Sequence, residues 1–242
     1  MKISKVFLFI FYLFFQNSIV NAIEITGIEN YYEKYLFDNY FLELNISLEN
    51  IGNNENISNL ITELIYHNHG FNEYAAYIEN LFLEDIGTTY FPDIIQEDGS
   101  VYIYRSYLSV EYSIEHINDN FIIIRYFEYV YYSGAAHGLY WIHYYIIDLS
   151  EKKLLEVNDL IINIPDEILI RKIESRYNIR YYLREYIWPP DSINFIKDGI
   201  ELYWNIYQIT PYSDGVIVIG FSYTDIEQYL TEKGRLMFAS IF

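Results

Sequence analysis

The chain has 242 residues, 52% of them hydrophobic, and carries 34 acidic against 15 basic side chains, a formal charge of −19. This composition excludes a disordered chain and argues against nucleic acid as a partner, because affinity for nucleic acid depends on neutralising phosphates with Lys and Arg. The chain has no cysteine, which excludes disulfides, thiolate metal sites and cysteine nucleophiles. A cationic protein or peptide is a better electrostatic match, although solubility is the plainer explanation for most of the carboxylates. The 29 tyrosines fit compositional drift of a biased genome better than a tyrosine-specific function.

Residues 1–22 have the pattern of a signal peptide. Lys2 and Lys5 precede an unbroken apolar run over residues 6–15, which is too short to span a bilayer, and Ala22 supplies a small residue at the cleavage position. We expect cleavage after Ala22, export to the periplasm or the cell exterior, and no membrane span in the mature chain. The alternative is that the segment is kept as an uncleaved anchor.

The first part of the exported chain predicts strands followed by helices. Residues 23–50 favour a strand or two, because apolar and polar side chains alternate there. Residues 57–65 place apolar side chains at helical spacing, with Asn56 as a cap and Gly70 as the end. Residues 71–82 repeat that spacing. The N-terminal half therefore predicts a helical pair.

The middle of the chain predicts antiparallel strands. Residues 102–112 alternate between apolar and polar side chains, residues 116–120 form a turn, and residues 121–132 form the next strand. A bend rich in small residues, 133–138, separates that strand from another at 139–148. Aromatic and β-branched residues dominate these runs, as is typical of half-buried strands.

The C-terminal half predicts one longer helix and further strands. The helix starts at Pro165 and runs to about Ile187, before two prolines. It carries basic residues at i+4 spacing, namely Lys172, Arg176, Arg180 and Arg184. These form either an anion-binding surface or a solvated helix face that pairs with the protein's own carboxylates. Residues 154–161 predict a short helical turn, residues 193–196, 200–207 and 216–221 predict strands, and residues 225–230 predict a short helix capped by Thr224 or Asp225.

Three segments resemble one family in the correct order. Tyr132–Gly138, YSGAAHG, is similar to the signature Y-x-G-G-A-H-G, and the segment from Asp148 to Leu160 is similar to D-x-x-T-G-K-x-L-x-L-x-D-L-F. Phe195 and the segment Gly199–Gly215 resemble a phenylalanine followed by G-L-x-F-x-F-x-x-Y-E-I-A-P-Y-A-x-G. The family is the exported bacterial domain of unknown function 3298, usually preceded by domain of unknown function 4163 in an RsiV-like extracellular module. The departures are Ala135, Glu151-Lys152, Thr210 and Ser213, and they affect turns more than chemistry.

The resemblance implies an α+β fold, an antiparallel β-sheet with helices packed on it. It also implies an N-terminal half, residues 23–138, that resembles domain 4163 and a C-terminal half, residues 139–242, that resembles domain 3298. Relatives with this module include an anti-sigma factor that binds lysozyme and the non-catalytic region of a peptidoglycan deacetylase. The resemblance implies no established reaction.

The candidate binding residues are Tyr132, His137, Tyr140 and Tyr212. His137 is the histidine of the family signature, and it is either a ligand or general base exposed at a strand bend, or a residue that pairs backbone groups left open by the bend. Ser133 lies four residues away, but no triad or nucleophile-elbow pattern surrounds the two. His137 is therefore a weak catalytic candidate. We predict no metal and no cofactor, because the histidines have no placed carboxylate beside them.

Three functional hypotheses follow. The first is an exported cell-envelope binding module, without catalysis, for a protein or a peptidoglycan-related ligand, with a lysozyme-like protein as the cationic example. The second is an envelope glycan hydrolase or transferase that uses His137. The third is a structural envelope protein.

Overall fold

The structure is a computed structural model that describes residues 24–37, 40–52, 55–65, 76, 80, 96, 104–133, 135–177 and 187–241. The chain divides into two compact units. Unit 1 comprises Met1–Tyr112 and Glu128–Leu139, and unit 2 comprises Ser113–Phe127 and Tyr140–Phe242.

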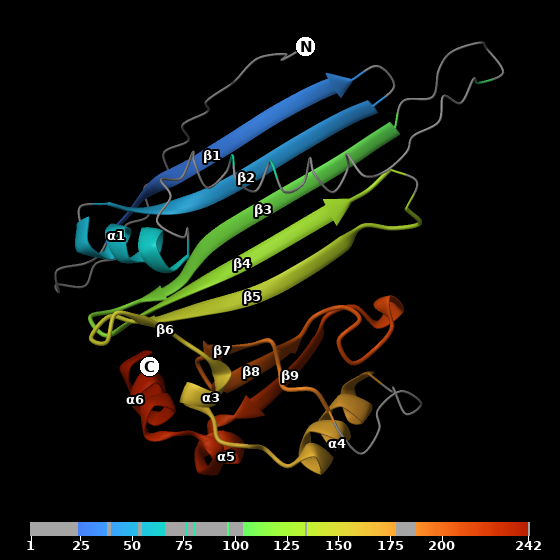
Figure 1. Cartoon of the computed structure of the whole chain (residues 1–242). Helices are drawn as coiled ribbons and strands as arrows, with labels where there is room; N and C mark the ends of the chain where they lie inside the picture. The colour runs from blue at the N-terminus through green and yellow to red at the C-terminus, as the bar shows by residue number, and fades with distance from the viewer. Residues whose placement is uncertain are drawn as a thin grey trace. The chain divides into compact units, whose positions relative to one another are not determined.

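The first six strands pair in the order of the sequence, β1-β2-β3-β4-β5-β6 (Figure 1). Their bounds are β1 Glu24–Phe37, β2 Tyr40–Gly52, β3 Tyr104–Ile117, β4 Phe121–Tyr131, β5 Leu139–Asp148 and β6 Lys153–Leu155. Strands β1 and β2 are antiparallel, with a bulge between Ile25 and Gly27. Strand β2 pairs with β3 in parallel, which requires a long connection such as the segment that contains α1. The strands that we predicted from the middle of the sequence are present.

Unit 1 contains the helix α1, Glu55–Leu64. It buries Ile57, Leu60 and Ile61, the apolar stripe that the helical spacing predicts. The helix already includes Asn56, so Asn56 is not its cap as we expected, because the helix begins one residue earlier. Of the second predicted helix, only Ala76 and Asn80 are described, and both are helical. The rest of residues 71–82 and Gly70 lie outside the described residues.

A second sheet of three antiparallel strands belongs to unit 2, in the order β7-β8-β9. The strands are β7 Ser192–Ile196, β8 Gly199–Trp204 and β9 Ile217–Ser222. Consecutive residues of β7 and β8 are buried, so both faces of this sheet are covered. Its core extends to Phe121, Ile146 and the helical residue Ile173. Strand β8 ends at Trp204, three residues before the expected end, because the chain turns at residues 205–208.

The described residues of unit 2 form four α-helices and two short 3-10 helices. The α-helices are α3 Val157–Leu160, α4 Asp166–Tyr177, α5 Tyr223–Ile226 and α6 Glu232–Ile241, and the 3-10 helices are η1 Tyr212–Asp214 and η2 Glu227–Tyr229. Helix α4 starts after Pro165 as predicted, and the predicted continuation over residues 178–186 lies outside the described residues. Together with α1 and the sheets, these helices confirm the α+β fold. Helix α5 is capped by Ser222, whose hydroxyl accepts from the backbone N–H of Asp225 at 3.3 Å, so the expected caps were wrong.

Helix α6 did not emerge from the sequence pattern. Thr231 caps it, since its hydroxyl accepts from the backbone N–H of Gly234 at 3.0 Å and donates to the carbonyl of Asp159 at 2.7 Å. The helix packs closely on α3, because a Cβ at Gly234 would lie 2.2 Å from the carbonyl oxygen of Leu160. None of the described helices has the length and apolar character that crossing a bilayer requires.

Side chains cover the outer edge of β9. The Tyr140 hydroxyl accepts from the N–H of Val216 at 3.3 Å, and the Tyr177 hydroxyl accepts from the N–H of Val218 at 2.9 Å. The Tyr177 hydroxyl also lies 3.2 Å from the Val218 carbonyl, and the Lys172 ammonium lies 3.3 Å from the carbonyl of Gly220. Every second residue of this edge therefore has a side-chain partner.

Candidate functional site

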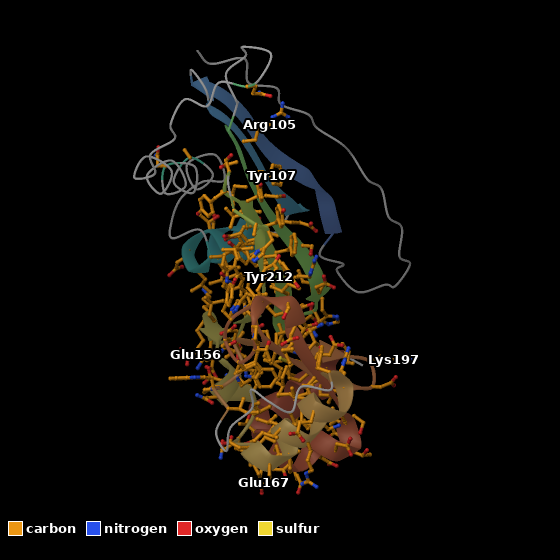
Figure 2. All side chains as sticks on the ribbon, turned by 90° about the vertical axis from the view of Figure 1, so that its right-hand side faces the viewer. Arg105, Tyr107, Glu156, Glu167, Lys197 and Tyr212 are labelled. Atoms are coloured by element: carbon orange, nitrogen blue, oxygen red, sulfur yellow. The ribbon has the colours of Figure 1, made fainter. Side chains whose placement is uncertain are left out.

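Three tyrosines from separate segments of unit 2 meet in what we call the tyrosine cluster: Tyr140 of β5, Tyr207 of the turn after β8, and Tyr212 of η1. The ring centroids of Tyr207 and Tyr212 are 5.9 Å apart, and those of Tyr140 and Tyr212 are 6.5 Å apart. Figure 2 shows the described side chains and labels Tyr212 among them. The rings of Tyr207 and Tyr212 are tilted by 36°, and those of Tyr140 and Tyr212 are edge-on at 74°, an arrangement that aromatic pairs prefer.

The position of Tyr140 depends on a glycine. Gly215 follows η1 with a φ of 74°, the left-handed region in which glycine is favoured. A Cβ at Gly215 would lie 2.7 Å from the Tyr140 hydroxyl, which accepts from the next backbone N–H at Val216. Both the backbone conformation and the available space therefore require glycine here.

Tyr207 lies in a strained turn. The N–H of Gln208 donates to the carbonyl of Asn205 at 3.1 Å, and Tyr207 between them has a φ of 66°. A bulky residue at positive φ is rare and costs on the order of 1–3 kcal/mol. The Tyr207 side chain is nonetheless 60% exposed. The turn therefore holds a large aromatic ring toward solvent in a conformation that tyrosine disfavours.

Asn205 anchors this turn to β5. Its side-chain amide accepts from the N–H of Ile142 at 2.8 Å and donates to the Ile142 carbonyl at 3.0 Å, as a neighbouring strand would. Strand β6 pairs only with the last three residues of β5, so Asn205 replaces a strand at this point. The Asp191 carboxylate accepts from both the backbone N–H and the side chain of Asn205, each at 2.9 Å.

Trp188 is a second exposed aromatic residue, and it lies next to Pro189, whose carbonyl holds the Gln208 end of the turn. The Gln208 side chain donates to the carbonyl of Pro189 at 3.0 Å, and Trp188 just before it is 61% exposed. The Trp188 carbonyl accepts from the ring N–H of the buried Trp204 at 2.7 Å. These contacts fix the backbone on both sides of the turn.

The sequence around Tyr207 and Tyr212 carries more acidic than basic side chains. Residues 187–216 contain four carboxylates and a single lysine, Lys197. Asp214 belongs to the same 3-10 turn as Tyr212. One of its carboxylate oxygens is buried and accepts no hydrogen bond from the part of the chain that the structure describes. A ligand that donates hydrogen bonds or carries positive charge suits this environment better than an anion.

The family signature lies in unit 1. The exposed His137 donates from Nδ1 to the carbonyl oxygen of Gly138 at 3.2 Å. Gly138 is required for packing, because a Cβ there would lie 2.4 Å from the Tyr129 ring. The Ser133 hydroxyl accepts from the N–H of Arg105 at 3.0 Å, and the Ser133 N–H donates to the hydroxyl of the buried Ser106 at 2.8 Å. Ser133 thus ties the end of β4 to β3.

The four predicted binding residues divide between the units. Tyr132, half-buried, and His137 belong to unit 1, whereas Tyr140 and Tyr212 belong to unit 2 and form part of the tyrosine cluster. Tyr207 was missed by sequence reasoning. Tyr207 matches the first tyrosine of the motif Y-E-I-A-P-Y, a signal that could have identified it, but we predicted residues 200–207 as one strand, and nothing in the local sequence marks a positive φ.

The predicted cationic edge of α4 is partly described. The Lys172 ammonium lies 4.6 Å from the centre of the Phe221 ring and 3.7 Å from the Asp225 carboxylate. The Arg176 guanidinium lies 5.6 Å from the centre of the Tyr177 ring. Arg180 and Arg184 lie outside the described residues. Lys172 therefore already has partners within the protein, and use as an anion site remains a prediction.

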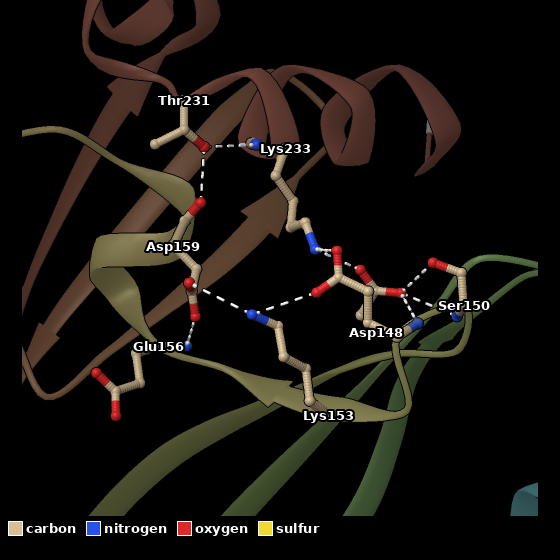
Figure 3. Close-up of polar contacts among 9 residues, drawn as sticks. Asp148, Ser150, Lys153, Glu156, Asp159, Thr231 and Lys233 are labelled. Atoms are coloured by element: carbon tan, nitrogen blue, oxygen red, sulfur yellow. Dashed lines mark hydrogen bonds and ion pairs between the residues drawn. The ribbon is translucent and has the colours of Figure 1, made fainter.

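A second polar group of residues joins the turn after β5 to α6 (Figure 3). The Asp148 side chain, 4% exposed, accepts from the Lys233 ammonium at 2.7 Å, from the Ser150 hydroxyl at 2.7 Å and from the backbone N–H of Glu151 at 2.9 Å. Burial alone would raise the pKa of Asp148, but the hydrogen bonds from Lys233, Ser150 and the Glu151 backbone outweigh it and lower this pKa to about 2. Lys233 also pairs with Glu151. We call Asp148, Glu151 and Lys233 the charged cluster.

The charged cluster has the features of a structural site. Both carboxylate oxygens of Asp148 accept hydrogen bonds from groups of the protein. The carboxylate therefore stabilises the contact between the turn and α6. Among the described residues, no group of three or more His, Asp or Glu side chains is arranged to hold a metal ion.

Burial lowers the pKa of His143, although the charge of Asp191 opposes this shift.

Neither a family model nor a curated protein matches the sequence. The solved structures that are similar to this chain include two from the DUF3298 family. One is a DUF3298 family member from Bacteroides fragilis, with a TM-score of 0.60 and 18% identity over 88% of this chain and 96% of that one. The other is a DUF3298 family protein from Pseudomonas aeruginosa, with a TM-score of 0.51 and 13% identity over 85% of this chain and 94% of that one. Both likenesses extend over most of each chain and concern the arrangement of the elements. The protein thus has the fold of DUF3298 family proteins.

Proposed function

We propose that this chain is an exported binding module of the cell envelope, without a reaction of its own, whose ligand is a cationic protein or a peptidoglycan-related glycan. A lysozyme-like protein is the first partner to test. The signal-peptide pattern of residues 1–22 supports export to the periplasm or the cell exterior.

The observation that carries the proposal is the tyrosine cluster with the exposed Tyr207. Tyr and Trp are enriched where proteins bind other proteins, since each buries a large area on binding and keeps a polar group for hydrogen bonding. The rings also suit stacking on the apolar face of a sugar. The backbone contacts of Asn205 and Gln208 hold this surface in place before any ligand arrives, which limits the entropic cost of binding.

The charge of the protein favours the cationic partner. With a formal charge of −19, the protein attracts a basic surface and repels other acidic proteins. This attraction weakens as salt rises, because counter-ions screen exposed charges. Retention of a glycan by stacking depends much less on salt. The two ligand classes are therefore distinguishable by their response to ionic strength.

The test is a retention experiment with the full protein. Purified protein is incubated with insoluble cell wall and with immobilised lysozyme, at low and at moderate salt, beside a resin that carries an acidic protein of similar size. We expect retention by one of the two ligands and loss of that retention in a Tyr207→Ala, Tyr212→Ala double variant that keeps its circular dichroism spectrum. Absence of retention on both ligands at low salt would overturn the proposal.

A further inference from the structure

We infer that the tyrosine cluster receives a basic side chain, lysine or arginine, of a protein partner, and that Tyr207 is the residue held out to meet it. This inference rests on the proposed function and specifies the ligand chemistry of the same site. It is carried by the strained backbone at Tyr207, by the fixed turn around it and by the charge of the surrounding segments.

The backbone at Tyr207 provides the first argument. Two non-glycine residues among the described ones have positive φ, Lys152 at 53° and Tyr207 at 66°. Lys152 is an exposed turn residue with a flexible polar side chain. Tyr207 is different, because it combines an unfavourable backbone with 60% exposure of a large aromatic ring. A turn of this shape suits glycine better, and strain of this kind clusters at ligand-binding sites.

The turn is fixed by contacts that do not involve the Tyr207 side chain. The Asn205 side chain is hydrogen-bonded to both backbone groups of Ile142 and donates to the Asp191 carboxylate, and the Gln208 side chain donates to the Pro189 carbonyl. Replacing the ring of Tyr207 therefore leaves these anchors intact. The ring's own contact is with Tyr212, which in turn meets Tyr140 edge-on.

Charge decides between a basic side chain and a neutral sugar. Aromatic faces attract cations through the ring quadrupole. Asp214 belongs to the same 3-10 turn as Tyr212, and the Asp191 carboxylate is hydrogen-bonded to Asn205 of the turn that holds Tyr207. Lys197 is the single basic residue in the stretch 187–216. A partner's ammonium or guanidinium group supplies the positive charge that these segments lack.

The experiment compares two probe peptides by isothermal titration. One is tetra-arginine with acetylated and amidated ends, and the other is tetra-citrulline, which has nearly the same shape without the charge. We expect the wild-type protein to bind tetra-arginine and to bind tetra-citrulline at least about tenfold more weakly. The Tyr207→Gly variant should bind tetra-arginine roughly 2- to 30-fold more weakly than wild type, the range of a cation–π contact.

Two further variants separate the aromatic ring from the backbone. Tyr207→Asn keeps a residue that tolerates positive φ, and we expect the same loss of binding. Lys152→Gly relieves a comparable backbone strain elsewhere in unit 2, and we expect unchanged or slightly tighter binding, because it removes a positive charge. Both Tyr207 variants should melt within a few degrees of wild type, since relief of strain offsets the lost contact with Tyr212.

Three results would overturn the inference: equal binding of the two peptides, wild-type affinity in Tyr207→Gly, or no binding of tetra-arginine at all. Retention on lysozyme or cell wall with any of these results leaves the proposed function standing and removes only the basic side chain as its ligand. If the peptides bind as expected but the protein is retained neither on lysozyme nor on cell wall, the basic side chain stands as the ligand of the tyrosine cluster. The proposed envelope partner is then overturned.

Discussion

The charged cluster and the tyrosine cluster are both built around a turn of unit 2, and they use polar groups in opposite ways. At the charged cluster, Asp148 is buried and its oxygens are filled by Lys233, Ser150 and backbone N–H groups. At the tyrosine cluster, Tyr207 is exposed and strained, and an oxygen of Asp214 is left without a described donor. A saturated polar site contributes to stability, whereas an exposed aromatic residue on a strained backbone is suited to contact a ligand.

The largest effect is expected from breaking the charged cluster. Asp148→Ala removes the acceptor of several donors and leaves Lys233 without its main partner, which should lower the free energy of unfolding by about 3 kcal/mol. Urea denaturation followed by circular dichroism measures this loss. Ser222→Ala, which removes a cap elsewhere in unit 2, is the control and should cost only about 1 kcal/mol. A smaller loss for Asp148→Ala than for Ser222→Ala would contradict the structural assignment.

The lowered pKa of Asp148 predicts how the free energy of unfolding depends on pH. The pKa of Asp148 in the folded protein is about 2, below its ordinary value of 3.8. Its contribution is therefore present above about pH 3.8 and is lost as the pH falls through about 2, and it amounts to about 2 kcal/mol. Unfolding measured from pH 5 to pH 2 should show a steeper loss for wild type than for Asp148→Asn. Parallel pH curves for the two proteins would show that Asp148 is not the group responsible.

A smaller effect is expected at the glycine beside Tyr140. Gly215→Ala places a Cβ 2.7 Å from the Tyr140 hydroxyl, at a φ of 74°, and should destabilise the protein by about 1–2 kcal/mol. Adding Tyr140→Phe removes the hydroxyl and should recover the steric part of the loss but not the backbone part. A thermodynamic cycle of the two single variants and the double variant measures the coupling. If the two substitutions are simply additive, the close contact contributes nothing.

The smallest effect should come from the other strained residue. Lys152→Gly relieves positive φ at an exposed position and should stabilise the protein by up to about 1 kcal/mol. Thermal unfolding of the variant beside Lys153→Gly, a control in β6 where glycine should destabilise, checks the sign. Destabilisation in both variants would mean that the backbone at residue 152 carries no strain.

Much of the fold is predictable because the strands carry local patterns. The alternation of buried and exposed residues along β3, and the aromatic run of β5, identify these strands without any tertiary information. Helix α6 is different, because it contains a glycine that only its close approach to Leu160 explains. Its start depends on Thr231, whose hydroxyl also bonds the carbonyl of Asp159, far away in the sequence.

The candidate site is less predictable than the fold. Tyr140 and Tyr212 stand out in the sequence, but their meeting depends on Gly215 and on the chain path between them. Tyr207 matches the first tyrosine of the motif Y-E-I-A-P-Y, but its positive φ gives no local signal, since its turn is held by Ile142, Asp191 and Pro189, residues 16 or more positions away. A conformation that distant contacts impose on a residue cannot be inferred from that residue's own neighbours.

The covered edge of β9 has a consequence for the protein in solution. An open strand edge is a template on which a second molecule can add its own strand. At β9 the hydroxyls of Tyr140 and Tyr177 and the ammonium of Lys172 occupy the backbone groups that such a strand would use. Two tyrosines and a lysine thus leave fewer open backbone groups at this edge for an added strand, without a proline or a bulge.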